Sequence, residues 1–171
     1  MVNELLVNMT KAAAPTPSVE AILHAIIPYK FVDHTHADSF IAISNSLQGE
    51  KIIKKIYDDL VIIIPYVMPG FDLAKLCAKY LDKGIKEGVI GILLLNHGIF
   101  SFGDTAEESY NRMLKLVKIS SDYLNKNIKL STPKNINNII NIEELAKLRK
   151  NVSNKVGKSM LLMSDRSNSN F

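Results

Sequence analysis

The 171-residue sequence contains one cysteine, Cys77, and no tryptophan. A single cysteine excludes an intrachain disulfide and suits a reducing compartment. No apolar run reaches the roughly 18–20 residues that cross a bilayer; the longest are Val89–Leu95 and a stretch that Pro65 and Pro69 interrupt. The first ten residues lack the basic segment of a signal peptide. We therefore expect a cytoplasmic protein with no membrane partner.

The charge balance is only mildly basic. Lys and Arg number 21 against 17 Asp and Glu, which gives a net charge of +4. The lysines are spread along the chain without an arginine cluster, so a solvated surface is the expected interpretation and a nucleic-acid partner is not. Apolar residues make up 47% of the sequence and charged residues 22%, a composition that excludes a disordered chain.

Apolar periodicity predicts an α/β domain in which strands and helices alternate. Strands are expected at 31–36, 60–64, 89–95 and 99–102, and helices at 19–27, 38–44, 50–57, 73–81, after Thr105, and around 142–156. Thr105 and Glu108 have the spacing of a capping box, and Tyr80 and Tyr110 fall in the apolar stripes of their helices. Residues 1–130 are therefore predicted to form the α/β domain, and 131–171 a linker with a basic helical appendage.

Three histidines lie in two compact motifs. His34 and His36 are two residues apart on a predicted strand, so both imidazoles point to the same face. His97 follows a buried strand and precedes Gly98, which allows a tight turn toward a cleft. Together the motifs favour a three-histidine metal site of the kind that zinc occupies. A surface pair on the strand and a core or capping histidine at the turn are the alternatives.

Acidic and polar side chains lie near these histidines. Glu20 is the candidate acid/base, although a carboxylate is also favoured near a helix start, where Ser18 is the expected N-cap. His24 lies one turn later and is expected to be a hydrogen-bonded core residue rather than part of the site. Asp33 and Asp38 flank the histidine pair and could orient the imidazoles as hydrogen-bond acceptors.

Three motifs resemble the class II aldolase/adducin family in their order and separation: Pro17–Glu20 with His24, Val32–Asp38, and Asn96–Phe100. Within the family, two further segments are similar to the branch of bifunctional rhamnulose-1-phosphate aldolase/short-chain dehydrogenases: Pro65–Gly70 and Phe102–Tyr110. The resemblance runs over most of the chain.

The resemblance implies a three-layer α/β/α domain and zinc-dependent aldol cleavage of a ketose 1-phosphate such as rhamnulose 1-phosphate. His34, His36 and His97 then match the Zn²⁺ ligands, and Glu20 matches the catalytic carboxylate, ideally with a raised pKa. Ser18 matches a position associated with the substrate phosphate. A homo-oligomer is also implied.

The sequence departs from that family in three respects, one of which is that no position matches the tyrosine acid of some relatives. Only 19 residues precede Glu20, so the N-terminal part of the domain with its phosphate-binding loops is expected to be missing. No GxGxxG motif of a dehydrogenase occurs anywhere in the sequence. Two alternatives therefore stay open: a metal-binding but non-catalytic, adducin-like or truncated module, and a sugar-phosphate epimerase of the same superfamily.

Overall fold

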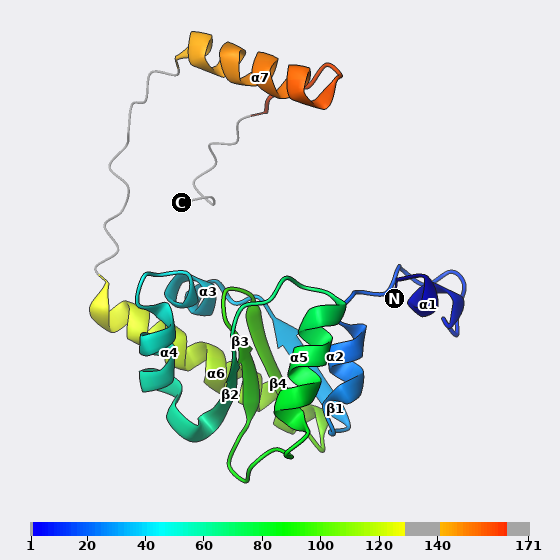
Figure 1. Cartoon of the computed structure of the whole chain (residues 1–171). Helices are drawn as coiled ribbons and strands as arrows, with labels where there is room; N and C mark the ends of the chain where they lie inside the picture. The colour runs from blue at the N-terminus through cyan, green and yellow to red at the C-terminus, as the bar shows by residue number, and fades with distance from the viewer. Residues whose placement is uncertain (1, 129–140, 164–171) are drawn as a thin grey trace. The chain divides into compact units, whose positions relative to one another are not determined.

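The structure is a computed structural model that describes residues 2–128 and 141–163 (Figure 1). It divides into two compact units, Met1–Lys129 and Leu130–Phe171, and each is described by itself. In the described residues no helix is long and apolar enough to cross a membrane.

The first unit alternates helices with short strands. Its helices are α1 (Val2–Val7), α2 (Ala21–Ile26), α3 (Asp38–Ser44), α4 (Gly49–Tyr57), the 3₁₀ turn η1 (Asp58–Leu60), α5 (Phe71–Leu81) and α6 (Ala106–Asn127). Its strands are β1 (Phe31–Thr35), β2 (Val61–Ile64), β3 (Gly91–Leu94) and β4 (Gly98–Gly103). All four predicted strands are present, and each lies within about two residues of its predicted bounds.

The strands form one mixed sheet in the order β1-β4-β3-β2. β2 and β3 are parallel, whereas β4 is antiparallel to both β3 and β1. A tight turn at 95–97 joins β3 to β4, and the register pairs Thr35 at the end of β1 with Ile99 at the start of β4. The end of β1 therefore lies next to the β3–β4 turn.

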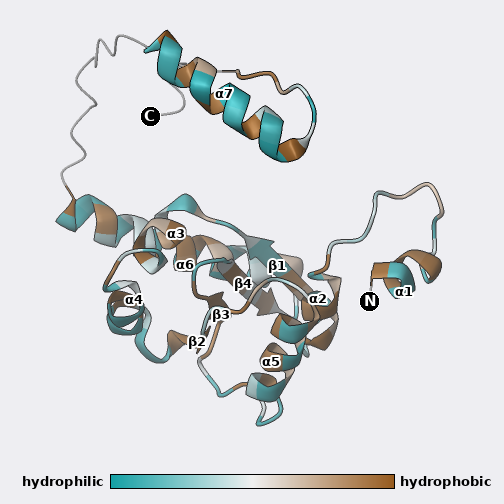
Figure 2. Ribbon diagram, turned by 45° about the horizontal axis from the view of Figure 1, so that its top comes forward, coloured by the Kyte–Doolittle hydropathy of each residue, from teal (hydrophilic) through white to brown (hydrophobic). Residues whose placement is uncertain are grey.

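Helices cover both faces of the sheet, which gives the predicted three-layer α/β/α arrangement (Figure 1). Alternate residues of β3 point to opposite faces: Ile92 and Leu94 pack in the core under α2 and α5, and Leu93 packs in the core under α3, α4 and α6. Apolar residues accordingly concentrate on the central strands in Figure 2. Burial on both faces explains why β3 is a continuous apolar run.

The long helix α6 packs through only part of its predicted stripe: Met113 is buried and Val117 and Leu124 pack against the core, but Leu114 is 50% exposed. Tyr110 is 58% exposed, and Tyr80 on α5 is 41% exposed, so the prediction that both are buried is wrong. Ser109 and Ser120 are instead fully buried on α6, because their small side chains allow close packing and their hydroxyls find hydrogen-bond partners. The predicted N-cap is confirmed, since Thr105 Oγ1 accepts a hydrogen bond from the Glu108 amide.

The second unit contains helix α7 (Ile142–Val156). The Asn141 side chain accepts a hydrogen bond from the Glu144 amide at its start, and Gly157 ends it with φ of +74°, a conformation that favours glycine. None of its residues is buried. The predicted basic helix is therefore present, while the predicted linker lies mainly at 129–140, outside the described residues.

Candidate metal centre

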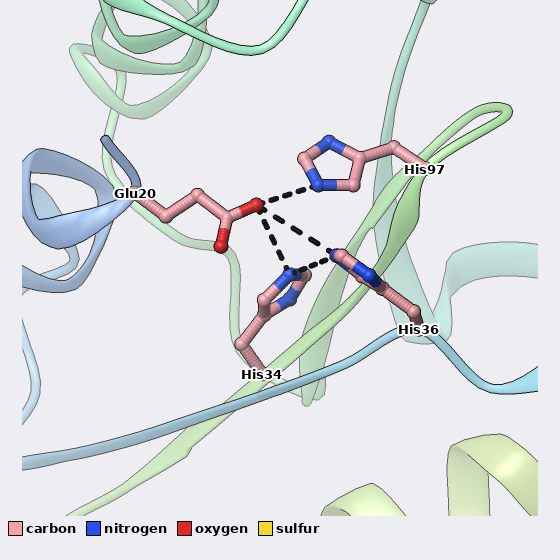
Figure 3. Close-up of side chains that lie close together, drawn as sticks. All are labelled: Glu20, His34, His36 and His97. Atoms are coloured by element: carbon pink, nitrogen blue, oxygen red, sulfur yellow. Dashed lines mark hydrogen bonds and ion pairs between the residues drawn. The ribbon is translucent and has the colours of Figure 1, made fainter. Parts of the chain in front are cut away.

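Four side chains predicted from separate motifs converge at one end of the sheet: Glu20, His34, His36 and His97 (Figure 3). Glu20 immediately precedes α2, His34 lies on β1, His36 follows β1, and His97 lies on the β3–β4 turn. One ligand atom from each side chain lies within 4.8 Å of the other three. Two strand ends and one helix start therefore supply the complete donor set.

One carboxylate oxygen of Glu20 is the centre of the cluster. Glu20 Oε1 lies 2.6 Å from His97 Nε2, 3.4 Å from His34 Nε2 and 3.7 Å from His36 Nε2. The His34 and His36 Nε2 atoms are 2.9 Å apart. Because the three Nε2 atoms face one point beside a carboxylate, they can offer their lone pairs to a single cation.

His34 is held in the tautomer that a metal ligand needs. Its Nδ1 lies 2.9 Å from the backbone carbonyl of Ile99, and a carbonyl can only accept, so Nδ1 carries the proton and Nε2 keeps its lone pair. The ring also stacks on Phe100, with centroids 4.0 Å apart and planes at 15°. Its position is therefore fixed by a hydrogen bond and by packing.

His97 is the most buried of the three imidazoles, with 7% of its side chain exposed, while His36 is 54% exposed. Within the described part of the chain, His97 Nδ1 has no hydrogen-bond partner. Asn96 before it adopts φ of +59°, which asparagine tolerates better than most residues. The turn thus directs His97 toward Glu20.

The four residues fit a divalent metal such as zinc. Burial lowers the pKa of His34 most strongly, and this outweighs the opposing effects of the Ile99 carbonyl and Glu20. A lowered pKa keeps the imidazole neutral, and the neutral form is the one that binds a metal. Three imidazoles with an adjacent carboxylate form a donor set typical of catalytic zinc sites.

The predicted raised pKa of Glu20 is wrong for this arrangement. Partial burial raises the pKa of the carboxyl group, but the positive charge of the imidazoles and the hydrogen bond from His97 more than offset it. The net pKa of Glu20 therefore lies below its ordinary value of 4.5. The sequence places Glu20 near a helix start but does not reveal three imidazoles around it.

Ser18 does not cap the helix as predicted. α2 begins at Ala21, with Glu20 at the N-cap position and no side-chain cap. The Ser18 hydroxyl instead accepts a hydrogen bond from the Glu20 amide at 3.1 Å and donates one to Glu20 Oε2 at 3.3 Å. Ser18 therefore helps to hold the carboxylate, and its assignment to a substrate phosphate stays a prediction.

Among the residues that the structure describes, the side chains of the other residues singled out near the motifs form no hydrogen bond with the four donor side chains. His24 is exposed and meets the edge of Phe100, so the prediction of a hydrogen-bonded core histidine is wrong. Asp33 accepts a hydrogen bond from Ser109 on α6 instead of orienting an imidazole, because its side chain points to the opposite face of β1. Asp38 begins α3, and in the part of the chain described no imidazole hydrogen bond reaches it.

A second segment at this end of the sheet was not assigned a role from the sequence. Residues 65–70 follow β2, whose last residue, Ile64, pairs with Leu94 at the end of β3. The loop carries Tyr66 and Met68, which are 52% and 71% exposed. Parallel neighbouring strands end at the same edge, so topology places this loop near the metal centre.

The lowered pKa of His34 predicts how acid affects chelator-treated protein. Below pH 6.5 the unfolded chain binds the proton before folded His34 does, so the free energy of unfolding falls as the pH drops from 7 toward 5. His34→Gln removes this contribution, which is at most about 1.4 kcal/mol per pH unit. Urea unfolding at pH 5, 6 and 7 measures how the free energy of unfolding changes with pH in the wild type and in His34→Gln. Equal slopes in the two proteins would contradict the prediction.

Comparison with known proteins agrees with this geometry. The family model "Class II Aldolase and Adducin N-terminal domain" matches residues 3–124. The solved N-terminal class II aldolase domain of a conserved Thermoplasma acidophilum protein is 39% identical with a TM-score of 0.62, covering 72% of this chain and 55% of that one. A sugar-phosphate aldolase from Thermotoga maritima shares the fold at 20% identity and a TM-score of 0.52, over 66% of this chain and 55% of that one.

A curated relative, the uncharacterized oxidoreductase YuxG of Bacillus subtilis (strain 168), is 35% identical over 128 residues. That match covers 75% of this chain but 18% of the relative. The chain thus spans about half the length of the solved relatives and less than a fifth of the curated one. The family match over most of its length nevertheless settles the assignment: the chain belongs to the class II aldolase and adducin family.

Proposed function

We propose that this chain carries the metal and proton-transfer centre of a class II aldolase-type lyase that cleaves a ketose 1-phosphate, most like rhamnulose 1-phosphate. The observation that carries the proposal is the convergence of three imidazole Nε2 atoms on one carboxylate oxygen of Glu20. The proposed ligands are His34, His36 and His97, and the proposed metal is Zn²⁺. Imidazole-rich sites suit zinc better than the oxygen-seeking cations Mg²⁺ and Ca²⁺.

Aldol cleavage of a ketose 1-phosphate requires stabilisation of a developing negative charge and two proton transfers. A zinc ion held by the three histidines would polarise the ketose carbonyl and stabilise the negative charge that develops when the carbon–carbon bond breaks. Cleavage removes a proton from the C4 hydroxyl and later adds one to C3, so no net proton is needed. We assign one of these transfers to Glu20, whose lowered pKa keeps it in the carboxylate form, the form that can accept a proton.

Ser18 supports this role of Glu20 through its two hydrogen bonds to that residue. We keep its second proposed role, contact with the substrate phosphate, because its side chain is exposed beside the centre. The proposal also has the protein act as a homo-oligomer in the cytoplasm, and light scattering of the purified protein tests the oligomer.

Glu20→Gln is expected to keep zinc affinity within about threefold while lowering the cleavage rate by at least about a hundredfold. Glu20 is not one of the three proposed ligands, so its loss leaves the imidazole donors in place, but the amide cannot accept a proton, and general acid–base catalysis contributes roughly 10²–10⁴-fold. Zinc affinity is measured by calorimetry. The cleavage rate is measured with rhamnulose 1-phosphate, by the release of dihydroxyacetone phosphate. A Glu20→Gln variant that retains more than about a tenth of the rate would overturn the role of Glu20.

The same assay separates the alternatives. Release of triose phosphate supports cleavage, whereas conversion to an isomeric sugar phosphate without triose phosphate identifies an epimerase. Zinc binding without turnover of any ketose or pentulose phosphate identifies a non-catalytic module. Failure of the wild-type protein to bind zinc would refute the metal centre itself.

A further inference from the structure

The strand that carries His34 is held in the sheet by only one neighbour. Among the described strands, β1 pairs only with β4, and every residue of β1 is half-buried. Neither face of β1 is consistently apolar: one presents Phe31, Asp33 and Thr35, and the other presents Val32 and His34. An apolar pattern normally fixes strand register, so β1 requires another device.

A polar network on the face of β1 away from the metal centre can serve as that device. The Ser109 hydroxyl of α6 donates a hydrogen bond of 2.5 Å to Asp33 Oδ2. Ser101, the β4 residue directly opposite Asp33, donates from its hydroxyl to the backbone carbonyl of Ser109 at 2.8 Å. These two bonds connect β1, α6 and β4 through three side chains.

The two serines of the network lie where a hydroxyl without a hydrogen-bond partner would be costly. Ser101 and Ser109 are both fully buried, and hydrogen bonds to an ionised group are stronger than those between neutral groups. A slip of β1 by one residue would bring Val32 or His34 opposite Ser109 and would turn Asp33 toward the other face. A slip by two residues would place Phe31 or Thr35 opposite Ser109. The Ser109 hydroxyl would then lose its acceptor, the Asp33 carboxylate.

The metal centre depends on this register. A slip of two residues would move His34 and His36 by roughly 6.6 Å along the strand. His97 and Glu20 lie on other elements and would stay behind, so the 2.6–3.7 Å distances within the cluster would be lost. The register of β1 therefore decides whether the four donors meet.

We propose that Asp33, Ser101 and Ser109 form a register lock that positions His34 and His36 for metal binding. The three are positioning residues, because they act through β1 and lie on the opposite face from the imidazoles. The inference rests on the proposed function only in naming zinc as the ion. The lock itself is a property of the metal-free fold and can be measured there.

Three variants test the lock against a matched control. Ser109→Ala removes the donor, Asp33→Ala removes the acceptor, and Asp33→Asn keeps an acceptor of the same size. Ser120→Ala is the control, because Ser120 is equally buried on α6 but hydrogen-bonds to Ser39 and the Val117 carbonyl, away from β1. Zinc affinity is measured against a chelator, and hydrogen exchange of the β1 amides is measured on metal-free protein.

Zinc affinity is expected to fall by about tenfold or more in Ser109→Ala and Asp33→Ala, as is typical when the support of a metal ligand is lost. Their β1 amides are expected to exchange faster. Asp33→Asn is expected to stay within about threefold of wild type, and Ser120→Ala to leave affinity and β1 exchange unchanged. Equal affinity in all variants, an equal loss in Ser120→Ala, or no rescue by Asp33→Asn would overturn the lock. Wild-type protein that binds no zinc would refute the proposed function, while β1 exchange would still decide the lock.

Discussion

Gly98→Ala is expected to lower zinc affinity by about a hundredfold although it changes no donor. A Cβ at residue 98 would lie 2.6 Å from the Thr35 carbonyl oxygen, 2.8 Å from His36 Cδ2 and 2.9 Å from His34 Cε1. All three distances are shorter than van der Waals contact, so β1 and both rings would have to move. Because Gly98 has no side chain, the rings of His34 and His36 can occupy the space beside its Cα.

The matched control for this variant is Gly91→Ala. Gly91 is equally crowded, since its Cβ would lie 2.5 Å from the Phe100 carbonyl oxygen and 2.5 Å from Leu116 Cδ1. The substitution should therefore destabilise the sheet but lower zinc affinity much less than Gly98→Ala does, because neither contact is with a donor residue. Calorimetry with zinc and urea unfolding separate the two effects. Parallel losses of affinity in both variants would show that Gly98 matters only for stability.

Phe100→Ala is expected to reduce the free energy of unfolding by about 3–5 kcal/mol and to weaken zinc binding as well. Phe100 is 1% exposed in the core under α2 and α5, and its ring is the surface on which His34 stacks. Truncation leaves a cavity in the core and lets the His34 ring tilt away from Glu20. Urea unfolding of chelator-treated protein gives the first effect, and zinc titration at low temperature gives the second.

Phe102→Ala supplies the comparison. Phe102 is fully buried on the same face of β4 and belongs to the same core, but its ring stacks on Tyr29, with centroids 4.5 Å apart, and not on a histidine. A similar loss of stability with nearly unchanged zinc affinity is expected. If both variants lose affinity equally, the stacking of Phe100 on His34 has no separate effect on the metal centre.

Local periodicity was sufficient for those parts of the centre that lie close together in sequence. The spacing of His34 and His36 predicts a shared face because side chains of a strand alternate, and the structure has Phe31–Thr35 as a strand. The position of His97 after a buried strand likewise predicts a residue at a sheet edge. Both inferences use only the geometry of one segment.

Contacts between distant segments could not be predicted in this way. From the sequence, Asp33 could orient an imidazole or face solvent, but its partner is Ser109, 76 positions along the chain. Ser109 itself has no apolar character that would mark it as a core residue, whereas Tyr110 beside it does and is exposed. A buried serine is recognisable only when its hydrogen-bond partner is known, and that requires the tertiary structure.

The wide separation of the four donors links the metal to folding. Glu20 and His97 are 77 positions apart yet share a hydrogen bond of 2.6 Å, so an unfolded chain keeps only His34 and His36 close together. An ion that needs His34, His36 and His97 together binds the native state almost exclusively. At a free concentration one hundred times its dissociation constant, such an ion would add about 2.7 kcal/mol to the free energy of unfolding. The thermal midpoint of this protein should therefore depend on the metal supply around it.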